Sequence, residues 1–549
     1  MMSRTGILGA VVLFVVVICL ANCGDDSMAG NATSVLPSVE PEQRVQAEHF
    51  SLFNEEAPVP PQCYTKTEGQ HNPCYTCHQR YMDRDTVYRS NKLDDGGIQG
   101  GYIFSDIGVT NHWHNLFIDK TEWIDRIDDD LILQYINQDN YSALQTRLST
   151  DSWSGFIPDL KNFQNAAAAF DENGMALDGS AWVAFNYKPL PSTFWPTNGS
   201  TDDVVIRLPE KFRTINGEYN QMVYMANLSL VELNLKQLSE IRLKQFDENL
   251  LQLDINGDQI YSTELTRLTP MSHYFGDASD VAVVQQQFPK GTEFMHSVRY
   301  VGLDEQQQVI VPKRMKELRY MKKIKELTES ELHSRYARER KEKRMEELPA
   351  YVNRGDDGLS NGLGWLVQGL IEDYEGQLRP QKFEEQMFCM GGHSAMGTTV
   401  DSTFSFVRKV TGPEGWRYIN LKGMQDAPSM TQDKGEILQY LQRAGGGNEF
   451  RENPEMLSKW YHPDGTVNED AVKAADVYTL ITPSPERALA LNKAYSYIVR
   501  HQSYIHGRDS NVLPAENVYR KIDESIVPLE PESRLFGWDM RLNWKEGAQ

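Results

Sequence analysis

The sequence predicts an α+β protein with several domains, and three observations support this class. Hydrophobic residues make up 40% of the 549 residues and aromatic residues 10%, which is enough for large packed cores. Aromatic and β-branched residues, separated by Pro, Asn and Gly, concentrate in the middle of the chain and indicate strands. A long charged run without Gly or Pro follows and indicates a helix. At roughly 150 residues per domain, the length allows two to four domains.

The N-terminus has the features of an export signal. Arg4 precedes an apolar run from Ile7 to Leu20, which is short for a membrane span and typical of a signal sequence. The run ends in LANC and resembles a bacterial lipoprotein signal, although Asn22 departs from the small residue preferred there. We therefore expect residues 1–23 to be the signal, with Cys23 lipidated. A plain cleaved signal and an uncleaved anchor are the alternatives.

Export has two further consequences. The polar, Pro-containing residues 24–45 are expected to be a flexible tether between the lipid and the folded body. Lipid chains on Cys23 would hold the protein at a membrane, either in the periplasm or at the outer membrane surface.

The regions that follow the tether differ in amino-acid composition. Residues 46–175 are rich in loops, with short helical patterns in DDDLILQYINQDNYSALQTRL. Residues 176–312 form the β-rich region: SAWVAFNYKPLPSTFWPTNG, DDVVIRLP, EYNQMVYMANLSLVEL and EFMHSVRYVGLDEQQQVIV all indicate strands. Within this region, apolar residues at helical spacing predict a helix over 235–251.

The C-terminal half begins with the charged run. Residues 313–348 are expected to form one long helix, which is basic in a chain of net charge −22. Its simplest interpretation is a solvated surface helix, and the alternative is a docking face for an acidic redox partner. Residues 349–549 combine Gly-rich loops with helices such as SPERALALNKAYSYIVRHQSYI.

A haem-attachment signature lies in NPCYTCHQ at residues 72–79. Cys74, Cys77 and His78 form C-x-x-C-H, in which two thiols bond covalently to haem and the adjacent histidine binds its iron. A zinc site would need a second pair of ligands at motif spacing, and none is evident. Export agrees with haem, because c-type haem is attached outside the bacterial cytoplasm. The region 46–175 is therefore predicted to bind haem c.

The distal ligand of that iron has three candidates in the sequence. His112 and His114 in NHWHN would share one face of an extended segment. His296 in TEFMHSVRY lies in a predicted strand. The HWH pair could instead bind a transition metal.

A second, incomplete signature lies in FCMGGHSAMG at residues 388–397. Cys389 and His393 have the spacing of a haem site, but Gly392 stands where the second cysteine would be. One interpretation is a second haem c held by a single thioether, in the C-terminal region. The rival is a disulfide between Cys63 and Cys389, which an oxidising compartment favours. A third is that neither forms.

Together these features resemble an exported bacterial c-type cytochrome of the mono- or dihaem lipoprotein type. The resemblance implies electron transfer in the cell envelope, with a redox partner protein and membrane attachment through lipid. Two alternatives remain: a dihaem peroxidase or oxidase-type oxidoreductase, and a structural envelope lipoprotein with haem. The net charge of −22 argues against a nucleic-acid partner.

A loop similar to a calcium-binding loop lies at residues 254–265, DINGDQIYSTEL. Asp254, Asn256, Asp258 and Glu264 supply the hard oxygen atoms that Ca²⁺ prefers. Gln259 departs from the pattern, because it stands where the sharp turn needs Gly. An Asn-Gly turn without a metal is the alternative.

Overall fold

The computed structural model of this protein describes residues 36–45, 52–80, 96–191, 199–347, 351–445 and 453–545. Residues 36–549 group into one unit by their contacts. The predicted signal, its Cys23 and the first part of the tether lie outside the described residues. Residues 36–45 of the tether contain one 3₁₀ turn, Pro41–Gln43.

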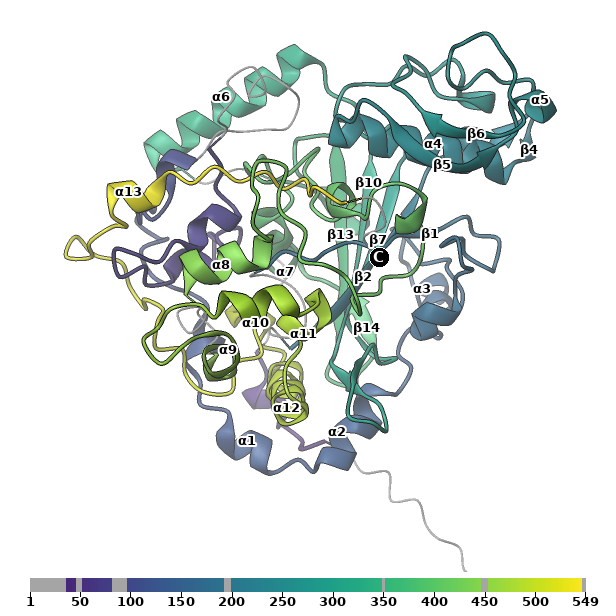
Figure 1. Ribbon diagram of the computed structural model, residues 1–549. Helices are drawn as coiled ribbons and strands as arrows, with labels where there is room; N and C mark the ends of the chain where they lie inside the picture. Colours follow the sequence, from purple (N-terminus) through teal and green to yellow (C-terminus); the bar gives the residue numbers. More distant parts are fainter. Residues whose placement is uncertain are drawn as a thin grey trace, which may run out of the picture. The chain divides into compact units, whose positions relative to one another are not determined.

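An antiparallel sheet of eight strands organises this unit (Figure 1). In order of pairing its strands are β1 (Val183–Ala184), β2 (Thr201–Arg207), β7 (Glu293–Arg299), β10 (Met315–Lys323), β13 (Trp365–Glu372), β12 (Leu359–Ser360) and β11 (Val352–Asn353), and β14 (Leu378–Pro380) pairs with β13. Smaller sheets pair β3 (Thr214–Ile215) with β4 (Glu218–Tyr219), β5 (Ile241–Phe246) with β6 (Leu265–Leu268), and β8 (Gly302–Leu303) with β9 (Val309–Ile310). The large sheet takes strands from three of the predicted regions.

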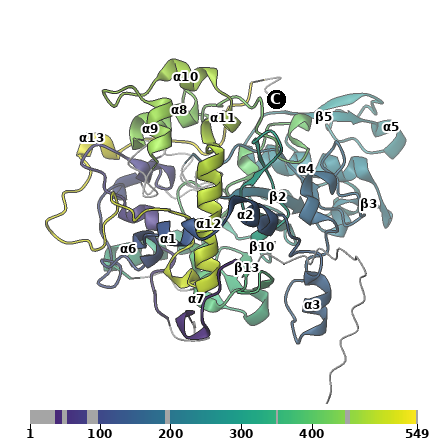
Figure 2. The same cartoon turned by 90° about the horizontal axis from the view of Figure 1, so that it is seen from below.

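The described helices surround this sheet. They are α1 (Thr121–Asp125), α2 (Asp129–Ile136), α3 (Leu144–Thr150), α4 (Gln221–Lys236), α5 (Glu248–Leu251), α6 (Glu329–Met345), α7 (Phe383–Met387), α8 (Glu436–Ala444), α9 (Pro454–Trp460), α10 (Glu469–Ala474), α11 (Val477–Ile481), α12 (Pro485–His501) and α13 (Pro531–Arg534). Figure 2 shows the long helix α12 running past the strands β2, β10 and β13. Ile498 and Val499 of α12 share a hydrophobic cluster with Ile371 of β13.

The two faces of the large sheet bury different residues, because successive side chains of a strand point to opposite sides. Ile206, Phe294, Met321 and Val367 belong to the main core, which also contains α4 and the C-terminal helices. Val205, Met295, Leu318 and Leu370 belong to a second core with α3 and residues 160–170. The first face is the one that carries the site described below.

The α+β class is confirmed, and several elements lie where the sequence predicts them. The short helices α2 and α3, the strands β7 to β9 and the long helix α12 match their predicted segments. Ser484 caps α12 by accepting a hydrogen bond from the Arg487 amide, and Pro485 occupies its first position, which are common features of a helix start.

Helix α4 replaces the strand predicted from EYNQMVYMANLSLVEL. The Asn220 side chain caps it by accepting from the Val223 amide. Twelve of its sixteen residues are buried, so it has no polar face. Without alternation between apolar and polar sides, its sequence shows no helical period and resembles a strand.

The helix predicted over 235–251 is also wrong. Helix α4 ends in the left-handed residue Gln237, and Ile241–Phe246 is the strand β5, paired with β6. Ile241 and Leu243 are buried two residues apart, as expected of a strand. A register shift between Arg242 and Phe246 brings Phe246 back to the buried side, which gives an apolar spacing close to that of a helix.

The single long helix predicted over 313–348 divides into a strand and a helix. β10 occupies Met315–Lys323 and is hydrogen-bonded on both sides, to β7 and β13. α6 begins only at Glu329, behind the capping residue Thr328. The charges conceal the strand, because Lys316, Glu317 and Lys323 are buried with polar partners inside the fold.

Candidate functional site

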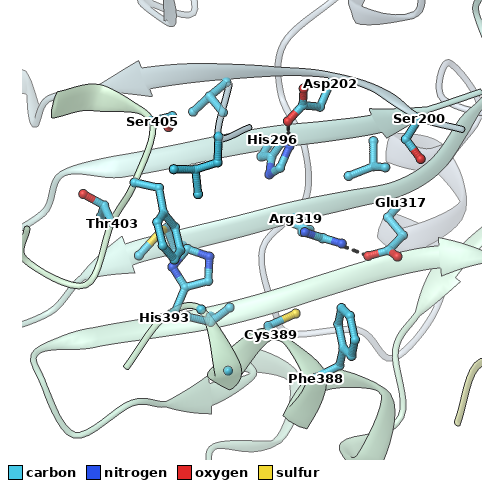
Figure 3. A pocket seen from close by; sticks show the side chains of 18 of the residues that line it. Ser200, Asp202, His296, Glu317, Arg319, Phe388, Cys389, His393, Thr403 and Ser405 are labelled. Carbon is cyan, nitrogen blue, oxygen red and sulfur yellow. Dashed lines mark hydrogen bonds and ion pairs between the residues drawn. The ribbon is translucent and has the colours of Figure 1, made fainter. Parts of the chain in front are cut away.

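A cavity of about 250 Å³ lies against the first face of the large sheet. Its floor is built from residues that alternate along four neighbouring strands, so that their side chains point to the same side. They form three cross-strand rows: Asp202, Val298 and Glu317; Val204, His296 and Arg319; and Phe294, Met321 and Val367. Figure 3 shows Asp202, His296, Glu317 and Arg319 on these strands.

The segment FCMGGHSAMG forms the opposite wall. Phe388, Cys389 and His393 line the cavity from there, facing the strands that carry Arg319 and His296 (Figure 3). The His393 amide donates to the Cys389 carbonyl at 3.0 Å, and the His393 carbonyl accepts from the Asn361 side chain at 2.9 Å. The thiol and the imidazole therefore come from one tight turn that is tied to the sheet.

Two glycines of this turn are required by close neighbours. A Cβ atom at Gly391 would collide with the backbone carbonyl of Pro58. A Cβ atom at Gly392 would lie 3.0 Å from the ring of Phe404, so a cysteine there would have to displace that ring. This close packing is a physical reason for glycine at the position of the missing second cysteine.

Cys77 lines the same cavity, together with Pro60 and Gln62. The two segments that the sequence singled out are far apart in the chain, yet both border one cavity. Their shared cavity could not be predicted from the sequence, because nothing in either motif specifies the distance between them.

The turn that carries C-x-x-C-H is held firmly by its surroundings. The Asn72 side chain accepts from the Tyr75 amide, and the amides of Cys77 and His78 both donate to the Cys74 carbonyl, at 3.1 and 2.8 Å. The buried Gln99 side chain donates to the His78 carbonyl at 2.7 Å. Both cysteines and the histidine therefore belong to a single turn with a fixed backbone.

Among the described residues, Cys63, Cys74 and Cys389 are free thiols. The Cys63–Cys389 disulfide is therefore absent from this structure. Burial raises the pKa of Cys63, and the neighbouring Cys77 and Cys74 raise it further, so Cys63 lies beside the haem-attachment turn. Burial likewise raises the pKa of Cys74 to about 11. Cys63 and Cys74 are therefore neutral thiols at physiological pH.

His393 is held as a neutral imidazole. Burial lowers its pKa to about 4, against the opposing effect of the Ser402 carbonyl, and Arg319 and His296 lower it further. Its Nδ1 lies 3.0 Å from the Ser402 carbonyl oxygen. A proton on Nδ1 would satisfy that oxygen and leave Nε2 as the basic nitrogen, an arrangement typical of metal-binding histidines.

Three charged groups form a bridge at the other end of the floor. Arg319 Nε and Arg508 Nη1 both donate to Oε2 of the buried Glu317, at 2.9 and 3.0 Å. Burial opposes ionisation of Glu317, but the two guanidinium groups outweigh it and lower its pKa to about 2. Glu317 is therefore anionic at neutral pH, and the trio carries a net charge of +1.

His296 pairs with a carboxylate on the neighbouring strand. Its Nε2 lies 3.1 Å from Asp202 Oδ2, which also accepts from the Tyr187 hydroxyl at 3.1 Å. Asp202 is buried, whereas His296 is partly accessible from the cavity. Such a histidine–carboxylate pair can accept or release a proton at the cavity wall.

His112 and His114 lie away from the cavity walls. They surround Phe53 together with His506, with ring centroids 5.4, 5.4 and 4.6 Å from that of Phe53. Among the described residues, no three His, Cys, Asp or Glu side chains are arranged to hold a metal ion. The structure thus places His296 and Cys77 in the lining of one cavity and groups the HWH pair elsewhere.

The calcium-like loop is arranged around its own backbone. Asp254 accepts from the amides of Gly257 and Gln259, and Asp258 accepts from the Ile260 amide. Asn256 donates to Asp258 at 2.7 Å. These bonds are those of an Asx turn, and Ca²⁺ binding by Asp254, Asn256, Asp258 and Glu264 stays a prediction.

Two tests of fit for haem give different answers. At Cys74, Cys77 and His78 the donor set is suitable: two cysteine side chains and the following histidine lie in one ordered turn. At Cys389 and His393 the donors are also suitable, but the cavity is smaller than the roughly 300–1,000 Å³ of sites for drug-sized ligands. A second haem there would require the surrounding side chains to move.

Several lining residues were not predicted from the sequence: Asp202, Glu317, Arg319, Tyr495 and Arg508. The alternation of Glu317, Arg319 and Met321 in KELRYM was a usable signal for a strand face. Tyr495 and Arg508 carried no local signal, because helix α12 and the segment after it reach the cavity only through the tertiary fold.

Comparison with known proteins identifies the family. Residues 45–479, more than half of the chain, match a family described as "-like lipoprotein". An "uncharacterized lipoprotein" of Aquifex aeolicus (strain VF5) is 31% identical over 571 residues, covering 92% of this chain and 93% of the relative. No solved structure matches the chain significantly. The chain belongs to this lipoprotein family.

Family membership also establishes where the protein works. As a lipoprotein it is exported and anchored by lipid in the cell envelope. Within the described ranges, every helix is too short or too polar to cross a membrane.

Proposed function

We propose that this envelope lipoprotein is a c-type cytochrome with haem attached at Cys74 and Cys77 and with His78 as the axial ligand. The observation that supports this most is the 3₁₀ turn Pro73–Thr76 with the two residues after it, because the amides of Cys77 and His78 both donate to the Cys74 carbonyl. Two cysteine side chains and an imidazole thus leave one short segment, as attachment at two adjacent vinyl groups requires. The haem would supply one-electron exchange.

Packing and hydrogen bonds with the C-terminal segment would hold the haem-attachment turn in place. Tyr75, between the cysteines, is buried against Phe536 and Trp538, with ring centroids 5.0 and 5.9 Å away. The Gln79 side chain accepts from the Trp538 amide and donates to the Tyr75 carbonyl. These contacts tie the turn to the C-terminal segment, so that the thiols and His78 keep a constant geometry.

A redox partner in the envelope would need a recognition surface, and α6 supplies one. This helix carries six Lys or Arg and four Glu residues in a chain of net charge −22. Leu332 and Tyr336 on its inner side pack with Ala395, in the segment that walls the cavity. An acidic partner docked on α6 would approach this segment, and its association rate would fall with rising salt.

The cavity favours a second candidate, an oxidoreductase that acts on a small molecule. Cys77 forms part of the cavity wall, so a group bonded to its sulfur would border the space that His296 and Arg319 face. Such convergence of polar side chains in a mostly apolar pocket is typical of binding sites. Turnover of peroxide by the reduced protein would support this candidate, and lack of turnover would favour simple electron transfer.

Covalent haem retention tests the proposal. The full chain should be expressed with c-type haem maturation, denatured, separated on a gel and stained for haem. We expect haem to stay with the wild-type chain and with Cys389→Ala, and to be lost from the Cys74→Ala/Cys77→Ala double variant. An unstained wild-type chain would refute the cytochrome proposal and leave a structural lipoprotein.

A further inference from the structure

One end of the cavity presents hydrogen-bond donors that lack acceptors. Tyr495 is 2% exposed, and its hydroxyl has no hydrogen-bond partner among the described residues. Arg508 is 8% exposed, and its Nε likewise has none within that part of the chain. Buried polar groups are almost always paired, so donors left open here indicate a missing acceptor.

Arg319 adds further donors to the same place. Its Nε bonds to Glu317, and its terminal nitrogens form no hydrogen bond with the described residues. The side chain emerges from the middle of the floor, between His296 and Cys389 (Figure 3). The Arg319 side chain is one-fifth exposed and lines the cavity.

These donors converge. Burial raises the pKa of Tyr495 well above its usual range, and the charges of Glu317, Arg508 and Arg319 all act on its hydroxyl. Glu317 binds both guanidinium groups, so these three donors surround one end of the cavity. Three carboxylates oppose them: Asp202 and Asp509 line the cavity, and Glu372 also acts on the Tyr495 hydroxyl. Asp202 Oδ2 is engaged by His296 and Tyr187, and its Oδ1 has no hydrogen-bond partner among the described residues.

Much of the remaining cavity wall is apolar. Leu190, Phe294, Met321, Val367 and Phe404 line it. Its volume of about 250 Å³ suits a body smaller than a drug-sized ligand. A ligand that matches both parts has an anionic acceptor at one end and an apolar body at the other.

We propose that Arg319, Arg508 and Tyr495 bind the carboxylate of a small apolar acid whose body fills this cavity. A carboxylate accepts several hydrogen bonds at once and complements the net positive charge of the Arg319–Glu317–Arg508 trio. The carboxylate has two conceivable sources. It belongs to a free acid, or to a propionate of the haem that the proposed function attaches at Cys77. The carboxylate site itself does not depend on that function.

Binding of benzoate, with neutral benzamide as its isostere, tests the site by calorimetry. Two forms of the full chain are compared: the haem-loaded wild type and the haem-free Cys74→Ala/Cys77→Ala variant. Benzoate binding to the wild type indicates a free acid. Benzoate binding to the haem-free form alone indicates that a haem propionate occupies the site. Haem content, measured separately, shows whether the cytochrome proposal holds, so the two proposals fail independently.

Variants identify the donors in whichever form binds benzoate. We expect Tyr495→Phe and Arg319→Gln each to weaken benzoate binding by about tenfold or more, and to change benzamide binding little. Tyr495→Phe removes a hydroxyl without a described partner, so it should leave the fold intact. Arg207→Gln is the matched control, because Arg207 is a similarly buried, ion-paired arginine of the same sheet outside the cavity. Failure of both forms to bind benzoate, or equal binding by Tyr495→Phe, would overturn the proposal.

Discussion

Replacement of Glu317 by Gln should destabilise the protein strongly at neutral pH. Glu317 is 2% exposed and accepts from both Arg319 and Arg508. Its pKa is lowered from 4.5 to about 2, and this difference corresponds to about 3 kcal/mol at roughly 1.36 kcal/mol per pKa unit. Glu317→Gln would lose this contribution and would leave two buried guanidinium groups without their shared carboxylate.

The pH dependence gives this prediction a second readout. Because folding lowers the pKa of Glu317, its contribution is fully present above 4.5 and is lost as the pH falls through about 2. Urea unfolding followed by tryptophan fluorescence should therefore show a large difference between wild type and Glu317→Gln at pH 7, and a shrinking difference under acid conditions.

Glu331→Gln is the control for this experiment. The pKa of Glu331 is also lowered to about 2, by its bonds to Lys325 and Thr328, but the side chain is partly exposed to solvent. Gln can replace Glu in the capping box of α6, so this variant should unfold nearly as the wild type does. Equal stability of Glu317→Gln and wild type at pH 7 would show that the ionised Glu317 does not stabilise the fold.

Three further predictions concern other parts of the fold. Gly358→Ala should cost more than Gly465→Ala in thermal unfolding, because both glycines have a positive φ but only at Gly358 would the new Cβ collide with a backbone carbonyl, that of Val367. Glu56→Gln should be more stable than wild type at pH 8 and similar at pH 4, because burial raises the pKa of Glu56 to about 7 and the wild type loses this stability as the pH rises. Cys389 should resist iodoacetamide at pH 7 until the chain is unfolded, as peptide mass spectrometry would show, because burial raises its pKa.

The sequence predicted elements best where one pattern dominated. Helix α12 has a Ser-Pro start and an amphipathic sequence, and the strand β7 lies in the run EFMHSVRYVG, which is rich in aromatic and β-branched residues. Prediction failed where burial removed the contrast between faces, as in α4, and where paired charges concealed a strand, as in β10. In both cases tertiary contacts outweighed local preference.

The candidate site was predicted only in part for a related reason. Cys77, Cys389, His393 and His296 could be selected by residue type and spacing, and all four line the cavity. Their proximity could not be predicted, because it depends on long-range pairing of the large sheet. Arg508 could not be selected either, because a single arginine in a loop carries no signal until its partner Glu317 is placed beside it.

Haem stoichiometry is the most direct test of haem attachment at Cys74 and Cys77. The mature full-length protein should be purified after expression with c-type haem maturation, and its pyridine haemochrome absorbance compared with protein concentration from amino-acid analysis. We predict one covalent haem per chain, and none in the Cys74→Ala/Cys77→Ala variant. A ratio of zero would contradict the cytochrome proposal, and a ratio of two would contradict the single attachment site by adding a haem at Cys389 and His393.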